Sequence, residues 1–284
     1  MVDSYFEIGG SHLVCQDYAL HGTFEGMEYG IVADGCSSAE HSEIGAQILC
    51  HVARNYLKLY HHGGLFKECK LGTITSMLGN SIVERADELR KLYPITREAL
   101  QATLLIIVRI ENEAFLFVWG DGVIIERYKP FEGSDTPKEF IIKIDYPANA
   151  PFYLATDIER YKEFLLKEKG EDKPYKIIET HINGVKHNDN TQTFYLPYAF
   201  KYDKYDRQCQ LASVTITTDG ILTYRDENKN PIDFTEIVPE VSKFKSKIGE
   251  FVKKRMTFFK RSVLKKQWTH YDDIAAATIL MDQK

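Results

Sequence analysis

The stretch YGIVADGCSSAE, residues 29–40, places a carboxylate and a glycine at the end of an apolar, strand-like run. An apolar run over residues 29–33 ends at Asp34 and Gly35, and a helical pattern begins a few residues later. An Asp-Gly pair is often only a turn. The alternative is that Asp34 binds a ligand and that Gly35 lets the backbone come close to that ligand.

The composition is that of an ordinary folded protein. Of its 284 residues, 44% are hydrophobic and 27% are charged, which is enough for one large domain. We expect no membrane span, because no segment approaches the roughly 18 apolar residues that one needs. Residues 1–10 lack the pattern of a signal peptide, and the five cysteines show no CxxC spacing. We therefore predict a reducing, cytoplasmic location.

Apolar periodicity predicts strands and helices in an order typical of an α+β fold built around antiparallel sheet. A hairpin-rich stretch over residues 102–128 follows two long helices, and residues 129–210 are the least regular part. The expected strands are 5–8, 13–21, 29–33, three within 102–128, 140–144, 175–180, 193–196, one ending at residue 218 and one from residue 272; the expected helices are one from residue 42, 73–92, 159–167 and 244–264.

Five aspartates lie at the ends of these predicted strands. They are Asp17, Asp34, Asp121, Asp219 and Asp272, and three of them are followed by glycine. One such residue alone would be a turn residue. Several that converge in space would repel each other strongly unless a cation lay among them. Carboxylates, a backbone carbonyl and water are the ligands that Mg²⁺ and Mn²⁺ prefer.

Six short motifs, in this order, resemble those of the metal-dependent Ser/Thr protein phosphatases of type 2C, the PPM-type family, in a divergent, bacterial-like form. They are HLVCQD (residues 12–17), VADG (32–35), ATLL (102–105), WGDG (119–122), TTDG (217–220) and DDIA (272–275). The resemblance implies a four-layer α-β-β-α sandwich, with two antiparallel sheets packed face to face and helices outside. It also implies a single domain over residues 1–284, with a variable flap-like region around 129–210.

The resemblance further implies a binuclear centre for Mg²⁺ or Mn²⁺, with a third ion in some members. Asp34 would bridge the two ions and the Gly35 carbonyl would bind one of them, while Asp219 and Asp272 would complete the shell of the other ion. Asp17 would hold metal-bound waters, and Asp121 matches the position for the third ion. In this scheme Asp34, Asp219 and Asp272 are catalytic through a metal-activated water, which attacks the phosphoryl group.

Two positions depart from the family pattern. His12 stands where an arginine usually grips the substrate phosphate, and Cys15 stands where asparagine is usual. Histidine is a weaker hydrogen-bond donor to phosphate than arginine, and the strength of its interaction depends on pH because its side chain loses its charge near neutral pH. We predict that His12 contacts the phosphate, and that Arg54, Arg85 or Arg160 is the alternative cation.

These features predict a protein-serine/threonine phosphatase that acts on phosphoproteins. The alternative is a catalytically weak or silent phosphatase-like domain that serves as a binding or scaffold module. Residues 243–266 carry ten Lys or Arg against one Glu. Such a segment binds anionic partners or forms a solvated outer helix, and we expect the helix and no nucleic acid. Within the flap-like region we expect residues 181–206 to lie beside the cleft and select the substrate.

Overall fold

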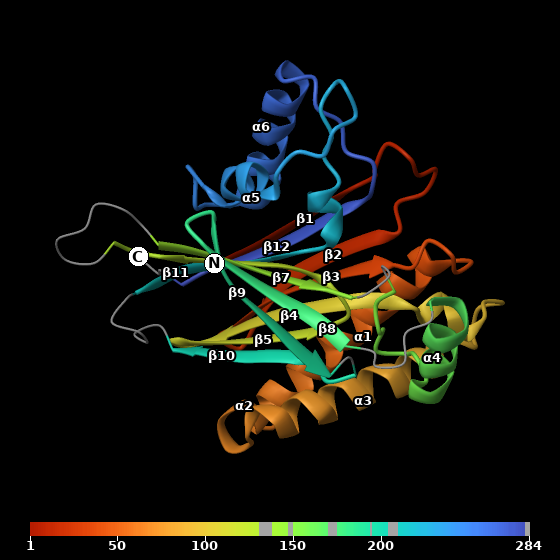
Figure 1. Cartoon of the computed structure of the whole chain (residues 1–284). Helices are drawn as coiled ribbons and strands as arrows, with labels where there is room; N and C mark the ends of the chain where they lie inside the picture. The colour runs from red at the N-terminus through yellow and green to blue at the C-terminus, as the bar shows by residue number, and fades with distance from the viewer. Residues whose placement is uncertain (131–137, 147–149, 170–174, 194, 204–209, 282–284) are drawn as a thin grey trace.

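Two antiparallel β-sheets lie between layers of helices in the computed structural model (Figure 1). The structure describes residues 1–130, 138–146, 150–169, 175–193, 195–203 and 210–281. The predicted α+β, four-layer architecture is confirmed. The flap-like region falls partly outside the described residues.

The first sheet has five strands, in the order β10-β5-β4-β3-β2. These are β2 (Asp17–Phe24), β3 (Met27–Gly35), β4 (Ala102–Ile110), β5 (Glu113–Trp119) and β10 (Tyr198–Asp203). Short turns join the hairpins β2–β3 and β4–β5. Glu25, Gly26 and Glu111 take up the positive φ angles that these tight turns need.

The second sheet has seven strands, in the order β1-β12-β11-β6-β7-β8-β9. These are β1 (Val2–Glu7), β6 (Gly122–Tyr128), β7 (Lys138–Asp145), β8 (Tyr175–Ile182), β9 (Val185–Thr193), β11 (Leu211–Thr217) and β12 (Ile274–Leu280). The chain passes from one sheet to the other at the turn between β5 and β6. It therefore places Asp121 at a corner of the sandwich.

Apolar side chains from both sheets form the core between them, among them Val32, Leu105 and Val118 from one sheet and Val214 and Ile279 from the other. A buried guanidinium also crosses this layer. Arg109 of β4 donates from Nη1 to the Leu280 carbonyl at 2.6 Å and lies 3.2 Å from Glu28. This pairing offsets the cost of burying its charge.

Helices cover the outer face of each sheet, on opposite sides of the sandwich in Figure 1. The helices are α1 (Ser42–His62), α2 (Leu65–Glu68), α3 (Leu71–Arg90), α4 (Ile158–Phe164), α5 (Phe234–Ser242) and α6 (Phe251–Lys265). Short turns of other helix types are η1 (Arg97–Leu100), η3 (Leu165–Lys169) and η5 (Asp219–Leu222). Among the described residues, no helix is long and apolar enough to cross a membrane.

Several predicted elements were wrong in their bounds. Residues 13–16 are not strand: β2 begins at Asp17, and the Leu13 side chain is almost fully exposed. The strand predicted at 193–196 lies earlier, as β9, whose polar side chains carry no alternating apolar pattern. The helix predicted over 244–264 begins only at Phe251, because Gly249 with φ +63° breaks the helical path and leaves Ile248 exposed. Helix α5 was not predicted.

Two neighbouring phenylalanines on α6 test its packing against the sheet. Phe259 is 2% exposed and Phe258 is 52% exposed. We expect Phe259→Ala to lower the free energy of unfolding by about 3–5 kcal/mol, because it leaves a cavity in the core. Phe258→Ala should cost much less. Denaturant unfolding of both variants measures the difference, and equal losses would contradict the described packing.

Candidate metal centre

Asp34 lies at the centre of the carboxylate cluster. It faces Asp17 in the pairing of β2 with β3. Its side chain is hydrogen-bonded to both Asp17 and Asp219. A hydrogen bond between two carboxyl groups needs a proton on one of them. Burial raises the pKa of all three carboxyl groups, while the hydrogen bond from Asp34 acts in the opposite direction on Asp17 and Asp219.

Thr218 joins the two sheets at the cluster. Its Oγ1 donates to Asp17 Oδ2 at 2.6 Å and accepts from the Ala275 amide at 2.9 Å. Its own amide donates to the Ala275 carbonyl at 3.0 Å. Thr218 thus fixes the start of β12 and the start of β2 relative to the end of β11. Sequence reasoning did not single it out, although it directly precedes Asp219 in TTDG.

Asp121 and Asp145 add two more carboxylates at the same end of the sandwich. Asp121 is buried in the turn between Gly120 and Gly122, both of which have positive φ. Asp145 ends β7 and interacts electrostatically with Asp121 and Asp219. Its signal in the sequence, an aspartate that ends the predicted strand 140–144, was overlooked.

Asp272 lies at the rim of the cluster, where its side chain is 40% exposed. Its charge raises the pKa of Asp219. Thr223 links the backbone after Asp219 to that of Asp272. Its hydroxyl donates to the Gly220 carbonyl at 2.8 Å and accepts from the Asp272 amide at 3.2 Å. The structure therefore brings all five predicted aspartates to one end of the sandwich.

Burial raises the pKa of Asp17, Asp34, Asp121 and Asp219, and the charges of neighbouring aspartates raise it further. Within the described residues, no three His, Cys, Asp or Glu side chains have donor atoms placed to hold one metal ion. Asp34 instead hydrogen-bonds to Asp17 and to Asp219. By donor type the cluster suits a hard divalent cation, which would replace the shared proton as the neutralising charge.

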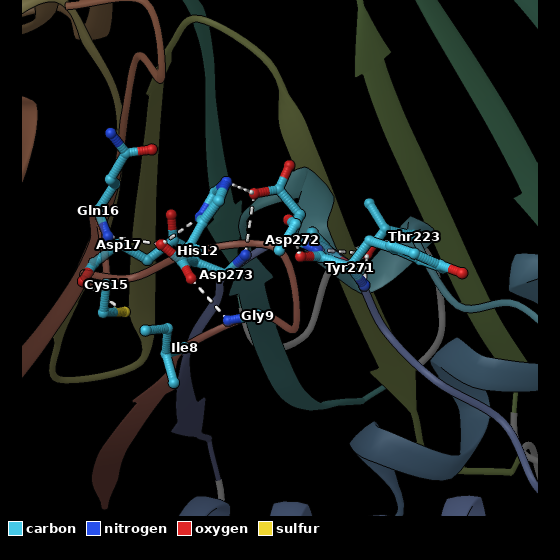
Figure 2. Close-up of polar contacts among 12 residues, drawn as sticks. Ile8, Gly9, His12, Cys15, Gln16, Asp17, Thr223, Tyr271, Asp272 and Asp273 are labelled. Atoms are coloured by element: carbon cyan, nitrogen blue, oxygen red, sulfur yellow. Dashed lines mark hydrogen bonds and ion pairs between the residues drawn. The ribbon is translucent and has the colours of Figure 1, made fainter.

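His12 lies over Asp272 and Asp273 (Figure 2). Its Nδ1 is 3.0 Å from Asp273 Oδ2, without hydrogen-bond geometry, and its Nε2 is 3.6 Å from Asp272 Oδ1. Asp273 is buried and accepts from the amides of Gly9 at 2.7 Å and Gln16 at 2.5 Å. It thus fastens the loop over residues 9–16 to the start of β12. Both ring nitrogens of His12 face carboxylates.

Glycine is required at two of the Asp-Gly pairs because backbone segments approach closely there. A Cβ on Gly220 would lie 1.7 Å from the Asp273 carbonyl oxygen. A Cβ on Gly35 would lie 2.8 Å from the Ser42 carbonyl oxygen and 3.0 Å from that of Gln16. Gly35, beside Asp34, thus allows the close approach of the Ser42 and Gln16 backbone, and it would allow that of a ligand in the same way.

A cleft of about 400 Å³ opens beside the loop that follows Gly35. Cys36, Tyr153 and residues 150–164 line it, together with Arg97 and Arg160. Of the three alternative arginines, only Arg160 lies here, where its Nη1 is 3.9 Å from Glu98 Oε1; Arg85 pairs with Glu88 on α3 and Arg54 lies on α1.

The prediction for residues 181–206 differs from what the structure shows. Their described part forms strands at sheet edges, β9 and β10, and His181 packs against Phe234 of α5. The edge strands lie there because β8 pairs with β7 and β10 with β5 along their lengths. Residues 150–164 line the cleft in their place.

Comparison with known proteins agrees with the motifs. Residues 9–131 match the family model described as protein phosphatase 2C. No curated protein matches the sequence. The fold resembles a bacterial serine phosphatase (TM-score 0.53, 10% identity, 100% of this chain and 98% of that chain) and the serine/threonine phosphatase Stp1 from Staphylococcus aureus (0.55, 10%, 99% and 95%). It also resembles serine-threonine phosphatase 2C from Toxoplasma gondii (0.50, 11%, 98% and 94%).

We expect Asp34→Asn to raise the melting temperature of the metal-free protein at pH 8, by about 2–4 °C for each kcal/mol gained. Because the pKa of Asp34 is raised in the folded chain, the contribution of Asp34 to wild-type stability is fully present below its ordinary pKa of 3.8 and is lost as pH rises through the raised pKa. The amide cannot ionise and donates to Asp17 and Asp219. Thermal unfolding in chelator at pH 5 and pH 8 measures this. A wild type that melts higher at pH 8 would contradict it.

Gly220→Ala should lower stability by about 3 kcal/mol or more, because the new methyl group meets backbone that has no room to move. Gly72→Ala is the matched control. Gly72 lies in α3 with nothing within 4 Å of its Cβ position, so alanine there should be neutral or stabilising. Thermal unfolding compares the two, and a harmless Gly220→Ala would refute the close approach.

Proposed function

We propose that this chain, whose fold and N-terminal sequence are those of type 2C phosphatases, hydrolyses phosphoserine and phosphothreonine in proteins with Mg²⁺ or Mn²⁺. The observation that carries the proposal is the position of Asp34 between Asp17 and Asp219 at one end of the sandwich. Buried, like-charged carboxylates are costly to keep together, and functional sites are where such costs are tolerated.

In this proposal Asp34, the Gly35 carbonyl, Asp219 and Asp272 hold two cations, Asp17 acts through water, and Asp121 belongs to a third ion. Two divalent cations supply an activated water and neutralise charge on the phosphoryl oxygens.

The remaining residues of the site hold these carboxylates in position. Thr218 donates to Asp17, so that one of its oxygens keeps a fixed direction. Asp273 fixes the loop that leads into Asp17, and Thr223 fixes the backbone of Asp272. A substrate that binds here meets groups whose geometry is already set, which is what catalysis by electrostatic stabilisation requires.

The second candidate function is a weak or silent domain that binds phosphoproteins without turnover. The geometry of His12 favours it: the residue that replaces the family's arginine faces Asp272 and Asp273. The retained aspartates favour catalysis.

Hydrolysis of an aryl phosphate with and without Mn²⁺ separates the two candidates. We expect activity that depends on Mn²⁺ and is lost in chelator. Asp34→Asn should reduce kcat by about 10³-fold or more, because it removes the central carboxylate without unfolding the chain. Asp189→Asn, at an exposed position of the edge strand β9, is the matched control and should stay within twofold of the wild type. Metal-independent or absent hydrolysis would support the silent domain.

His12→Arg tests whether this position reaches the substrate phosphate. A guanidinium binds phosphate as a fork and should lower KM about tenfold if the side chain reaches it. The measurement is KM for an aryl phosphate and for a phosphopeptide at pH 7. An unchanged KM would instead assign His12 to holding Asp272 and Asp273.

A further inference from the structure

A groove of about 360 Å³ lies beside Asp272. The loop that carries Ser11 and His12 forms one wall, and the hairpin over residues 223–231 forms the other. Arg225 and Lys229 project from this second wall. The volume lies in the range of ligand-binding clefts and exceeds what a single phosphoryl group fills.

The hairpin that carries these two cations is rigid. The Arg225 amide and carbonyl both pair with Thr269, at 2.8 and 2.9 Å, and the Ile232 amide donates to the Tyr224 carbonyl. Asp226 holds the tip, because its carboxylate accepts from the Asn228 and Asn230 amides and from the Asn230 side chain. The conformation of the hairpin therefore does not depend on the side chains of Arg225 and Lys229.

The two cations have no counter-charge of their own. Neither side chain makes an ion pair or hydrogen bond with any residue in the part of the chain that the structure describes. The nearest acid in sequence, Asp226, is engaged by the amides of the hairpin tip. Asp272 is the one acid among the described residues that lines the groove, and it is a proposed metal ligand. The groove therefore presents two positive charges without ion-pair partners next to Asp272, on a hairpin whose backbone is held by hydrogen bonds.

We propose that this groove binds an acidic side chain of the substrate, next to the phosphorylated residue, and so directs the enzyme to acidic phosphoproteins. The proposal rests on the proposed phosphatase function. A carboxylate that enters the groove meets the planar fork of Arg225 and the ammonium of Lys229 while the phosphate lies at the aspartate cluster. Fixed complementary charge beside a reacting centre selects among substrates.

The experiment compares two phosphoserine peptides that differ only in having glutamate or glutamine around the phosphorylated residue. We expect the wild type to prefer the glutamate peptide about tenfold in kcat/KM, which corresponds to about 1.4 kcal/mol. Arg225→Gln should reduce this preference to less than about threefold, and Lys229→Gln should reduce it in part. Because neither side chain supports the hairpin, both variants should melt like the wild type.

Two controls separate selection from damage. Arg85→Gln removes an arginine that pairs with Glu88 on α3, so it should leave the preference unchanged. A small aryl phosphate has no flanking acid, so Arg225→Gln should hydrolyse it within about twofold of the wild type. An equal loss on the aryl phosphate would mean that the groove binds the phosphoryl group itself, and a wild type with no preference would overturn the proposal.

A binding measurement keeps this proposal separate from the proposed function. Fluorescence anisotropy follows binding of the same two peptides with a non-hydrolysable phosphonate in place of the phosphate. If the wild type hydrolyses no phosphoester, the phosphatase proposal fails. Tighter binding of the glutamate peptide to the wild type than to Arg225→Gln would then still support the groove. Equal binding of both peptides by both proteins would overturn it.

Discussion

The burial of several carboxyl groups within reach of one another is the constraint on which the rest of this structure depends. Asp17, Asp34, Asp121 and Asp219 are withdrawn from water at one end of the sandwich, and this burial, together with the charges of neighbouring aspartates, raises the pKa of each of them. Such a cluster exists in a folded chain only with a proton or a cation among its members. Without a cation, the cluster therefore needs at least one shared proton.

Hydrogen bonds to threonine hydroxyl groups fix the positions of the residues in this cluster. Thr218 donates to Asp17, the Thr103 hydroxyl accepts from the Asp34 amide, and Thr223 anchors the backbone beside Asp272. These neutral groups fix the geometry of the carboxylates. A lysine or arginine in their place would also neutralise the negative charge. The negative charge of the site consequently stays available to a ligand. The contact of Thr218 with Asp17 also connects the two sheets, so the site and the packing of the sandwich stabilise each other.

Charge is divided between the centre and its rim. The centre is acidic and buried, whereas Arg225 and Lys229 lie on an exposed hairpin and Arg160 lies across the cleft beside Cys36. Salt screens the two sets of charges differently. The interactions of the exposed cations are screened over about 8–10 Å, whereas those of the buried carboxylates are screened much less. The basic segment over residues 243–266 is separate from this rim. Part of it packs on the sheet through Phe251, Val252 and Phe259.

The sequence by itself determined most of the order of strands and helices, though not α5, as well as the α+β class and the five aspartates, because apolar periodicity and Asp-Gly turns are local signals. It did not determine the bounds of β9 and α6, where polar edge strands and a single left-handed glycine carry weak signals. Only the tertiary structure decided that His12 faces Asp272 and Asp273, that Asp145 joins the cluster and that Arg225 and Lys229 flank it. These contacts join residues as many as 261 positions apart, as in the pair His12 and Asp273, and the spacing of residues along a chain does not specify which distant side chains meet.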